Sequence, residues 1–93
     1  MIRAVVLYES EPEAERYARH VEEFANPVPG ATFRHGKATG APFGEPAFAY
    51  YGEFEWADQD SFDAAMRSAE WPASGKDAMG MGIRFSVTFV ELD

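Results

Sequence analysis

The chain contains no cysteine, and this absence removes several kinds of chemistry at once. Without thiols there is no disulfide, no thiolate nucleophile and no thiolate metal ligand. Only two histidines are present, and they form neither an HxxxH nor an HxH spacing, so we expect no transition-metal site. Fingerprints for flavin or nicotinamide binding are also absent, and the sequence therefore predicts a protein without a cofactor.

Positive charge is scarce as well. Eight Lys and Arg residues stand against sixteen Asp and Glu residues, which gives a formal net charge of −8. Such a chain repels phosphate backbones and anionic lipid, so nucleic acid and membrane surfaces are not expected as partners. Apolar runs long enough to span a bilayer are missing, and the N-terminus lacks the pattern of a secretion signal. We therefore expect a soluble cytoplasmic protein.

Apolar and aromatic residues are plentiful by contrast. The 93 residues are 46% hydrophobic and 15% aromatic, more than a disordered segment carries. This length suits one folded domain, which we place at residues 1–93.

The first third of the chain predicts a strand and a helix. Residues 2–8 (IRAVVLY) are apolar on both alternating faces, as in a strand covered on both sides. Ser10 is a candidate N-cap, and apolar residues then recur at helical spacing. The members of this stripe are Ala14, Tyr17, Ala18, Val21, Phe24 and Ala25. The prolines of residues 26–30 (NPVPG) end the helix.

The middle of the chain predicts two strands joined by a loop. Residues 31–38 form a weakly patterned strand, and the loop at 39–46 is rich in Gly and Pro. Residues 47–56 alternate plainly. Phe48, Tyr50, Phe54 and Trp56 share one face, and Ala49, Tyr51, Glu53 and Glu55 share the other.

The last third predicts a helix and a final strand. The helix begins after an Asp58 cap and runs until a break at Trp71-Pro72. Residues 73–82 are expected to form one helical turn and a glycine-rich entry into the next strand. Residues 83–92 alternate as that strand, with Ile83, Phe85, Val87 and Phe89 on one face.

The order of strand, helix, strand, strand, helix and strand predicts a ferredoxin-like α+β fold, with a four-stranded antiparallel sheet and both helices on one face. The uncovered face is expected to hold Val5, Leu7, Phe33 or its neighbours, Tyr51, Glu53, Arg84, Ser86 and Thr88. Its apolar part favours a homodimer in which two sheets pair face to face. The alternative is a monomer whose open sheet is less polar than average.

Several segments, taken in order, resemble the EthD family of dimeric α/β-barrel proteins. Residues 2–8 resemble its first strand. Residues 16–20 (RYARH), followed by 28–30 (VPG), are similar to the family's spacing of a tyrosine, a histidine and a hydrophobic-Pro-Gly triplet. Residues 53–58 (EFEWAD) and the helix that follows, with SFDAAM at 61–66 and SAE at 68–70, resemble its strand-to-helix signature.

This resemblance implies a homodimer, a dimeric α/β barrel with a cavity between sheet and helices in each protomer. The family is linked to oxidative degradation pathways and is classed loosely with oxidoreductases. Its structural relatives include cofactor-free monooxygenases, muconolactone isomerases, polyketide cyclases and fungal dehydratases.

His20 is the first candidate catalytic residue. It lies at the boundary of the apolar stripe of its helix, where an imidazole can act as general acid or base on a ligand between helix and sheet. The alternative is a solvated side chain that pairs with Arg16 or Glu23 one turn away. His35, in the weak strand, either points into the cavity or belongs to ordinary surface.

Tyr51 and Glu53 are the other candidate catalytic residues, and both belong to the open face. A phenol can donate to a developing oxyanion, and a carboxylate among aromatics can take part in proton transfer. The alternative is an internal ion pair of Glu53 with an arginine at the dimer seam. The expected substrate-binding residues are Leu7, Phe33, Arg84 and Ser86.

Together these features predict a protein that binds a small hydrophobic or aromatic metabolite. One hypothesis is a cofactor-independent enzyme, a monooxygenase, isomerase or dehydratase, in which His20 is the acid or base while Tyr51 and Glu53 polarise the substrate. The other is a non-catalytic ligand-binding or accessory protein, or a purely structural dimer.

Overall fold

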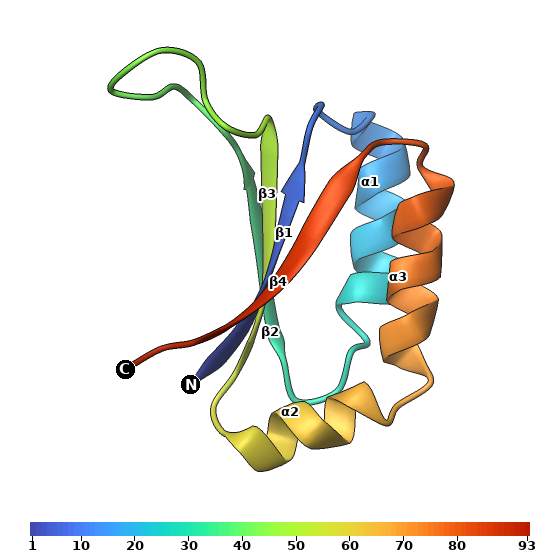
Figure 1. The fold of residues 1–93 in the computed structure, drawn as a ribbon. Helices are drawn as coiled ribbons and strands as arrows, with labels where there is room; N and C mark the ends of the chain where they lie inside the picture. Colours follow the sequence, from blue (N-terminus) through green and yellow to red (C-terminus); the bar gives the residue numbers. More distant parts are fainter.

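A four-stranded antiparallel sheet carries helices on one face only (Figure 1). The computed structural model describes residues 1–93, and the spatial order of the strands is β2-β3-β1-β4. The strands are β1 (Ile2–Tyr8), β2 (Thr32–Lys37), β3 (Tyr50–Trp56) and β4 (Phe85–Glu91). The helices are α1 (Ala14–His20), η1 (Val21–Ala25), α2 (Gln59–Met66) and α3 (Glu70–Gly80). The predicted ferredoxin-like α+β fold is therefore confirmed.

The core lies between the sheet and the helices. Alternate residues of β1 point into it, and Ile2, Ala4, Val6 and Tyr8 are all buried, while the residues between them are half-buried on the other face. Trp56 at the end of β3 is fully buried, and its indole N–H donates to the carbonyl of Pro29 at 3.0 Å. The alternation of residues that predicted the strands thus also separates the core residues from the residues of the open face.

The first helix begins later than predicted. Glu13, and not Ser10, is its N-cap, because the Glu13 carboxylate accepts from the amides of Glu15 at 3.2 Å and Arg16 at 2.7 Å. After His20 the helix widens into the π-helical segment η1, in which the amide of Asn26 donates to the carbonyl of Val21 at 2.8 Å.

The predicted helix break at Trp71-Pro72 is wrong. α2 already ends at Met66, and a separate helix, α3, begins at Glu70. Pro72 is the third residue of α3, in the first turn, where a backbone N–H has no intrahelical partner to lose. Residues expected to form one turn and a glycine-rich entry therefore belong mostly to an 11-residue helix that lies beside α1 (Figure 1).

The edge strand β2 decides one placement. Phe33 pairs with Phe54 and so lies on the helix face, whereas Arg34 pairs with Glu53 on the open face. Of the two placements left open, Phe33 or its neighbours on the open face, the structure puts Arg34 there and Phe33 on the helix face, because the weak alternation of this strand left its register undetermined. The loop from 38 to 49 projects away from the helices (Figure 1), and Phe43 on it is 90% exposed.

Candidate functional site

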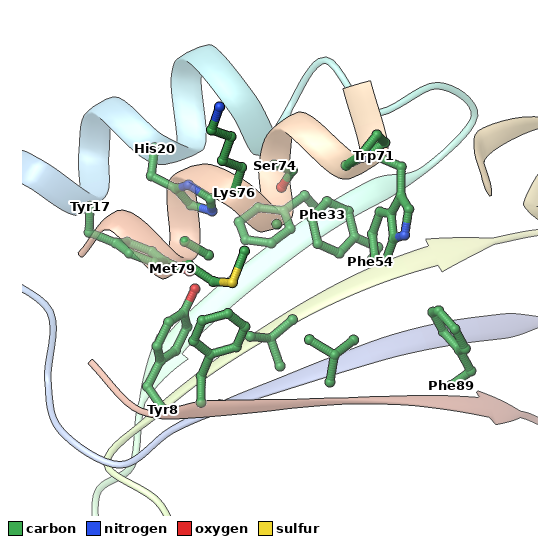
Figure 2. A pocket seen from close by; sticks show the side chains of 16 residues that line it. Tyr8, Tyr17, His20, Phe33, Phe54, Trp71, Ser74, Lys76, Met79 and Phe89 are labelled. Carbon is green, nitrogen blue, oxygen red and sulfur yellow. The ribbon is translucent and has the colours of Figure 1, made fainter. Parts of the chain in front are cut away.

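A cavity of about 520 Å³ lies between the sheet and the helices α1 and α3 (Figure 2). Eleven of its sixteen lining residues are hydrophobic, and this size and character suit a small organic ligand. Exposed apolar side chains mark its open side, with Met79 66% and Phe89 52% exposed. The hydrophobic cavity that the sequence predicted between sheet and helices is therefore present.

His20 lines this cavity from α1 and is only 3% exposed, so the alternative of a solvated side chain is wrong. Its Nδ1 lies 2.8 Å from Oδ2 of Asp77 on α3. Arg16 holds the same carboxylate with two hydrogen bonds of 2.9 Å and also donates to the backbone carbonyl of Asp77 at 3.1 Å. One helix thus supplies the imidazole, and the other supplies the carboxylate that orients it.

The protonation state of this cluster follows from its surroundings. Burial works to raise the pKa of Asp77, but hydrogen bonds from Arg16 and His20 outweigh it, and the net pKa lies below the ordinary value. Because an ionised carboxylate only accepts, the His20 proton must sit on Nδ1. Burial lowers the pKa of His20 against the opposing effect of Asp77, so the ring is neutral near pH 7. Nε2 is left with a free lone pair.

Two tyrosine side chains complete the polar end of the cavity. Tyr8 rises from the sheet with its hydroxyl toward the helices, and Tyr17 approaches from α1 (Figure 2). The two rings meet edge to face with centroids 5.8 Å apart. Burial raises the pKa of both phenols, so both stay protonated.

Tyr51 and Glu53 lie on the opposite face of the sheet from His20. Glu53 accepts from the Tyr51 hydroxyl at 2.8 Å and from Arg34 at 2.8 Å. Arg3 donates to the neighbouring Glu55 at 2.7 Å, and Arg34 reaches this carboxylate at 3.0 Å. The prediction that His20, Tyr51 and Glu53 act on one ligand is therefore wrong within a protomer, because alternate residues of a strand face opposite ways.

The expected substrate-binding residues are also divided between the two faces. Phe33 lines the main cavity. Leu7, Arg84 and Ser86 instead share a hollow of about 330 Å³ on the open face. His35 does not line the main cavity: its ring packs against Phe33 with centroids 5.7 Å apart, and its Nδ1 is 2.8 Å from the Tyr50 hydroxyl at a separate hollow.

Asp77 and Tyr8 are the site residues that the sequence analysis missed. Asp77 was overlooked because residues 73–82 were expected to form only one helical turn and a glycine-rich entry into the next strand, and not most of an 11-residue helix. The signal for it was present: Ser74 and Ala78 are four apart, the spacing of a buried helical stripe, with Asp77 beside it. Tyr8 shares a face with the core residues of its strand, so it was indistinguishable from core.

No group of three or more histidine, aspartate or glutamate side chains is arranged to hold a metal ion. None of the helices has both the length and the apolar character of a membrane span.

Solved structures with this fold indicate which protein family the chain resembles. An EthD family protein from Bacillus halodurans superposes with a TM-score of 0.76 at 28% identity, over 100% of this chain and 99% of that one. The chain is therefore similar to an EthD family protein over its whole length. The resemblance predicted from the sequence is confirmed, although a scan against protein-family models and a search of curated proteins find no match.

Two further structures share the EthD-like fold at lower identity. A dimeric ferredoxin-like protein of unknown function from Jannaschia matches with a TM-score of 0.70 at 20% identity, over 98% of both chains. SnoaB, a cofactor-independent oxygenase from Streptomyces nogalater, matches with a TM-score of 0.59 at 18% identity, over 98% of this chain and 91% of that one. These likenesses establish the fold.

Proposed function

We propose that this EthD-like protein is a cofactor-independent enzyme that binds a small hydrophobic or aromatic metabolite and removes a proton from it with His20. The observation that carries the proposal is the buried imidazole whose Nδ1 is held by Asp77 at 2.8 Å while the ring lines an apolar cavity. A base oriented by a carboxylate is the arrangement that general-base catalysis requires.

The proposed step balances without a cofactor. Nε2 of His20 takes a proton either from a carbon next to a carbonyl, so that the electron pair of the broken C–H bond moves onto the carbonyl oxygen, or from a phenolic O–H, so that the pair stays on the phenol oxygen. Asp77 stabilises the imidazolium that forms, as a carboxylate does in other histidine dyads. The resulting anion can be reprotonated elsewhere, can expel water, or can react with molecular oxygen as oxidant. These outcomes correspond to the predicted isomerase, dehydratase and oxygenase chemistries.

Quaternary structure is the second part of the proposal: the chain forms a homodimer through its open sheet face. The half-buried Val5 and Leu7 lie on this face beside the network of Arg3, Arg34 and Glu53. The dimeric relative from Jannaschia supports this assembly. The net charge of −8 and the lack of cysteine favour a cytoplasmic location. Light scattering over a dilution series should give the mass of a dimer, whereas a stable monomer would contradict the proposed assembly.

Proton removal is tested with 2-tetralone, an aromatic ketone with acidic C–H bonds next to its carbonyl. We expect the protein to bind it and to accelerate exchange of those hydrogens with D2O, measured by NMR. His20→Gln should bind 2-tetralone but lose about 100-fold or more of the exchange rate, the usual contribution of a positioned base. Arg67→Lys, at the exposed end of α2 and outside the cavity and the open face, is the control.

Two results would contradict the proposed enzyme. Equal exchange rates for the wild type and His20→Gln would remove His20 from the chemistry. Binding of 2-tetralone without any acceleration of exchange would favour a ligand-binding or accessory protein.

A further inference from the structure

Tyr8 is a buried polar side chain for which the fold itself has no evident need. It is the last residue of β1 and is only 2% exposed. Its ring packs between Tyr17 and Phe85, with centroid distances of 5.8 and 5.6 Å. A phenylalanine would fill this space equally well, so the hydroxyl calls for an explanation of its own.

The hydroxyl of Tyr8 points from the sheet into the cavity, toward Met79 and the helices (Figure 2). The adjacent Tyr17 hydroxyl can donate toward it, which opposes the rise that burial causes in the pKa of Tyr8 and adds to that in the pKa of Tyr17, and the Tyr8 proton itself has no protein acceptor within hydrogen-bonding distance. The Tyr17 hydroxyl is itself buried and has no other partner. A hydroxyl whose proton has no acceptor in an apolar cavity indicates an acceptor supplied from outside.

The opposite wall of the cavity holds His20. Tyr8 reaches the ligand space from β1 and His20 reaches it from α1, so a ligand between sheet and helices lies between the two (Figure 2). One side chain is a protonated phenol that can donate, and the other is a neutral imidazole that can accept. A ligand that satisfies both has an oxygen atom on its sheet side and a C–H or O–H group on its helix side.

We infer that the Tyr8 hydroxyl donates a hydrogen bond to an oxygen atom of the ligand and thereby selects aromatic ketones and phenols over hydrocarbons of the same shape. This inference rests on the proposed function and narrows its ligand class. When His20 removes a proton, the electron pair arrives on the oxygen that Tyr8 contacts, where a fixed donor stabilises the developing charge.

The test compares 2-tetralone with tetralin, which has a CH2 group in place of the carbonyl. Affinities are measured by calorimetry for the wild type and Tyr8→Phe. We expect Tyr8→Phe to lose about tenfold in affinity for 2-tetralone, the size of one hydrogen bond, and to bind tetralin unchanged. Tyr50→Phe is the matched control, because the Tyr50 hydroxyl is bonded to His35 outside the main cavity and its loss should leave both affinities unchanged.

Folding is checked by urea denaturation without ligand. Tyr8→Phe should be at least as stable as the wild type, because it removes a hydroxyl whose proton has no acceptor and keeps the ring. A clear fall in the urea midpoint of Tyr8→Phe would show that the hydroxyl serves the fold and would overturn the inference.

The binding results separate this inference from the proposed function. An equal loss for both ligands, or no loss for either, would overturn the role of Tyr8 while leaving His20 and the cavity in place. Failure of the wild type to bind both 2-tetralone and tetralin would overturn the proposed ligand class together with this inference.

Discussion

The two faces of the sheet are built from the same strands, yet they treat polar groups in opposite ways. On the open face, the Glu53 carboxylate accepts from Tyr51 and Arg34, and Glu55 accepts from Arg3. On the helix face, the hydroxyl of Tyr17 is buried without a partner other than Tyr8. A face whose polar groups satisfy one another serves structure or assembly, whereas unpaired groups around a cavity are available to a ligand.

The difference between the polar groups of the two faces follows from how far water reaches them as well as from the sequence. The side chains of Arg3 and Arg34 are 33% and 50% exposed, so water shares in their solvation and each ion pair contributes little by itself. His20 and Asp77 are more deeply buried, and there a hydrogen bond also determines which protonation state exists. Breaking contacts on each face in turn should separate these roles.

The largest effect is expected in the helix-face core. Trp56→Ala removes a fully buried indole and its hydrogen bond to Pro29, and should lower the free energy of unfolding by about 3–5 kcal/mol. Urea denaturation measures the loss. Thr88→Ala, on the open face, should stay within about 0.5 kcal/mol of the wild type. Similar losses at both positions would contradict the assignment of the core to one face.

A smaller effect is expected from the open-face network. Glu53→Gln keeps the shape of the side chain but leaves Arg34 and Arg3 without their shared charge. We expect a loss of about 1–2 kcal/mol in unfolding free energy, less than for a fully buried pair because both arginines are partly exposed. Glu91→Gln, at the exposed end of β4, is the control. Equal stability of the two variants would show that the network contributes nothing.

Acid should weaken the helix face through His20. Its folded-state pKa lies below the ordinary value of 6.5, so the unfolded chain binds the proton more readily. The contribution of His20 to stability is therefore complete above pH 6.5 and declines as the pH falls from there toward the folded-state pKa. Urea denaturation of wild type and His20→Gln across this range should show a steeper decline for the wild type. Parallel curves would contradict the lowered pKa.

The smallest effect is a gain in α3. Gly75 lines the cavity from the interior of this helix, and a Cβ atom there would meet nothing within 4 Å. Gly75→Ala should therefore raise the unfolding free energy by about 0.5–1 kcal/mol, the helix-propensity difference. Gly82→Ala is the contrasting variant, because the positive φ of 74° makes it destabilising. Destabilisation by Gly75→Ala would contradict the open space around this position, because it would show that the added Cβ atom meets a neighbouring atom.

Hydrophobic alternation predicted the strands because each has one covered face. The burial pattern of β1 alternates over all seven residues, so its register was evident from the sequence alone. At Phe33 the same reasoning failed, because β2 is an edge strand whose residues are mostly exposed on both sides. Alternation is informative only where burial differs between the two faces.

The site was harder to predict because its parts are far apart along the chain. His20 could be proposed as a site residue from its helical position. Its partner Asp77 lies 57 residues away in α3, a helix that was not predicted because Pro72 was interpreted as a helix break. A proline ends a helix only when it falls beyond the first turn, and nothing in the local sequence shows which turn it occupies. The tertiary contact, and not the local pattern, makes His20 an oriented base.

Because η1 is π-helical, the number of residues between His20 and Ala25 determines whether both side chains point into the interior. The i to i+5 hydrogen bond of η1, from Asn26 to Val21, lets both His20 and Ala25 be buried although they are five positions apart. Deleting one residue between them, such as Glu23, would leave them four positions apart, and in an ordinary helix residues at that spacing still share one face. A one-residue gap in related sequences is therefore expected within η1 and not within α1, where it would turn Tyr17 or His20 out of the interior.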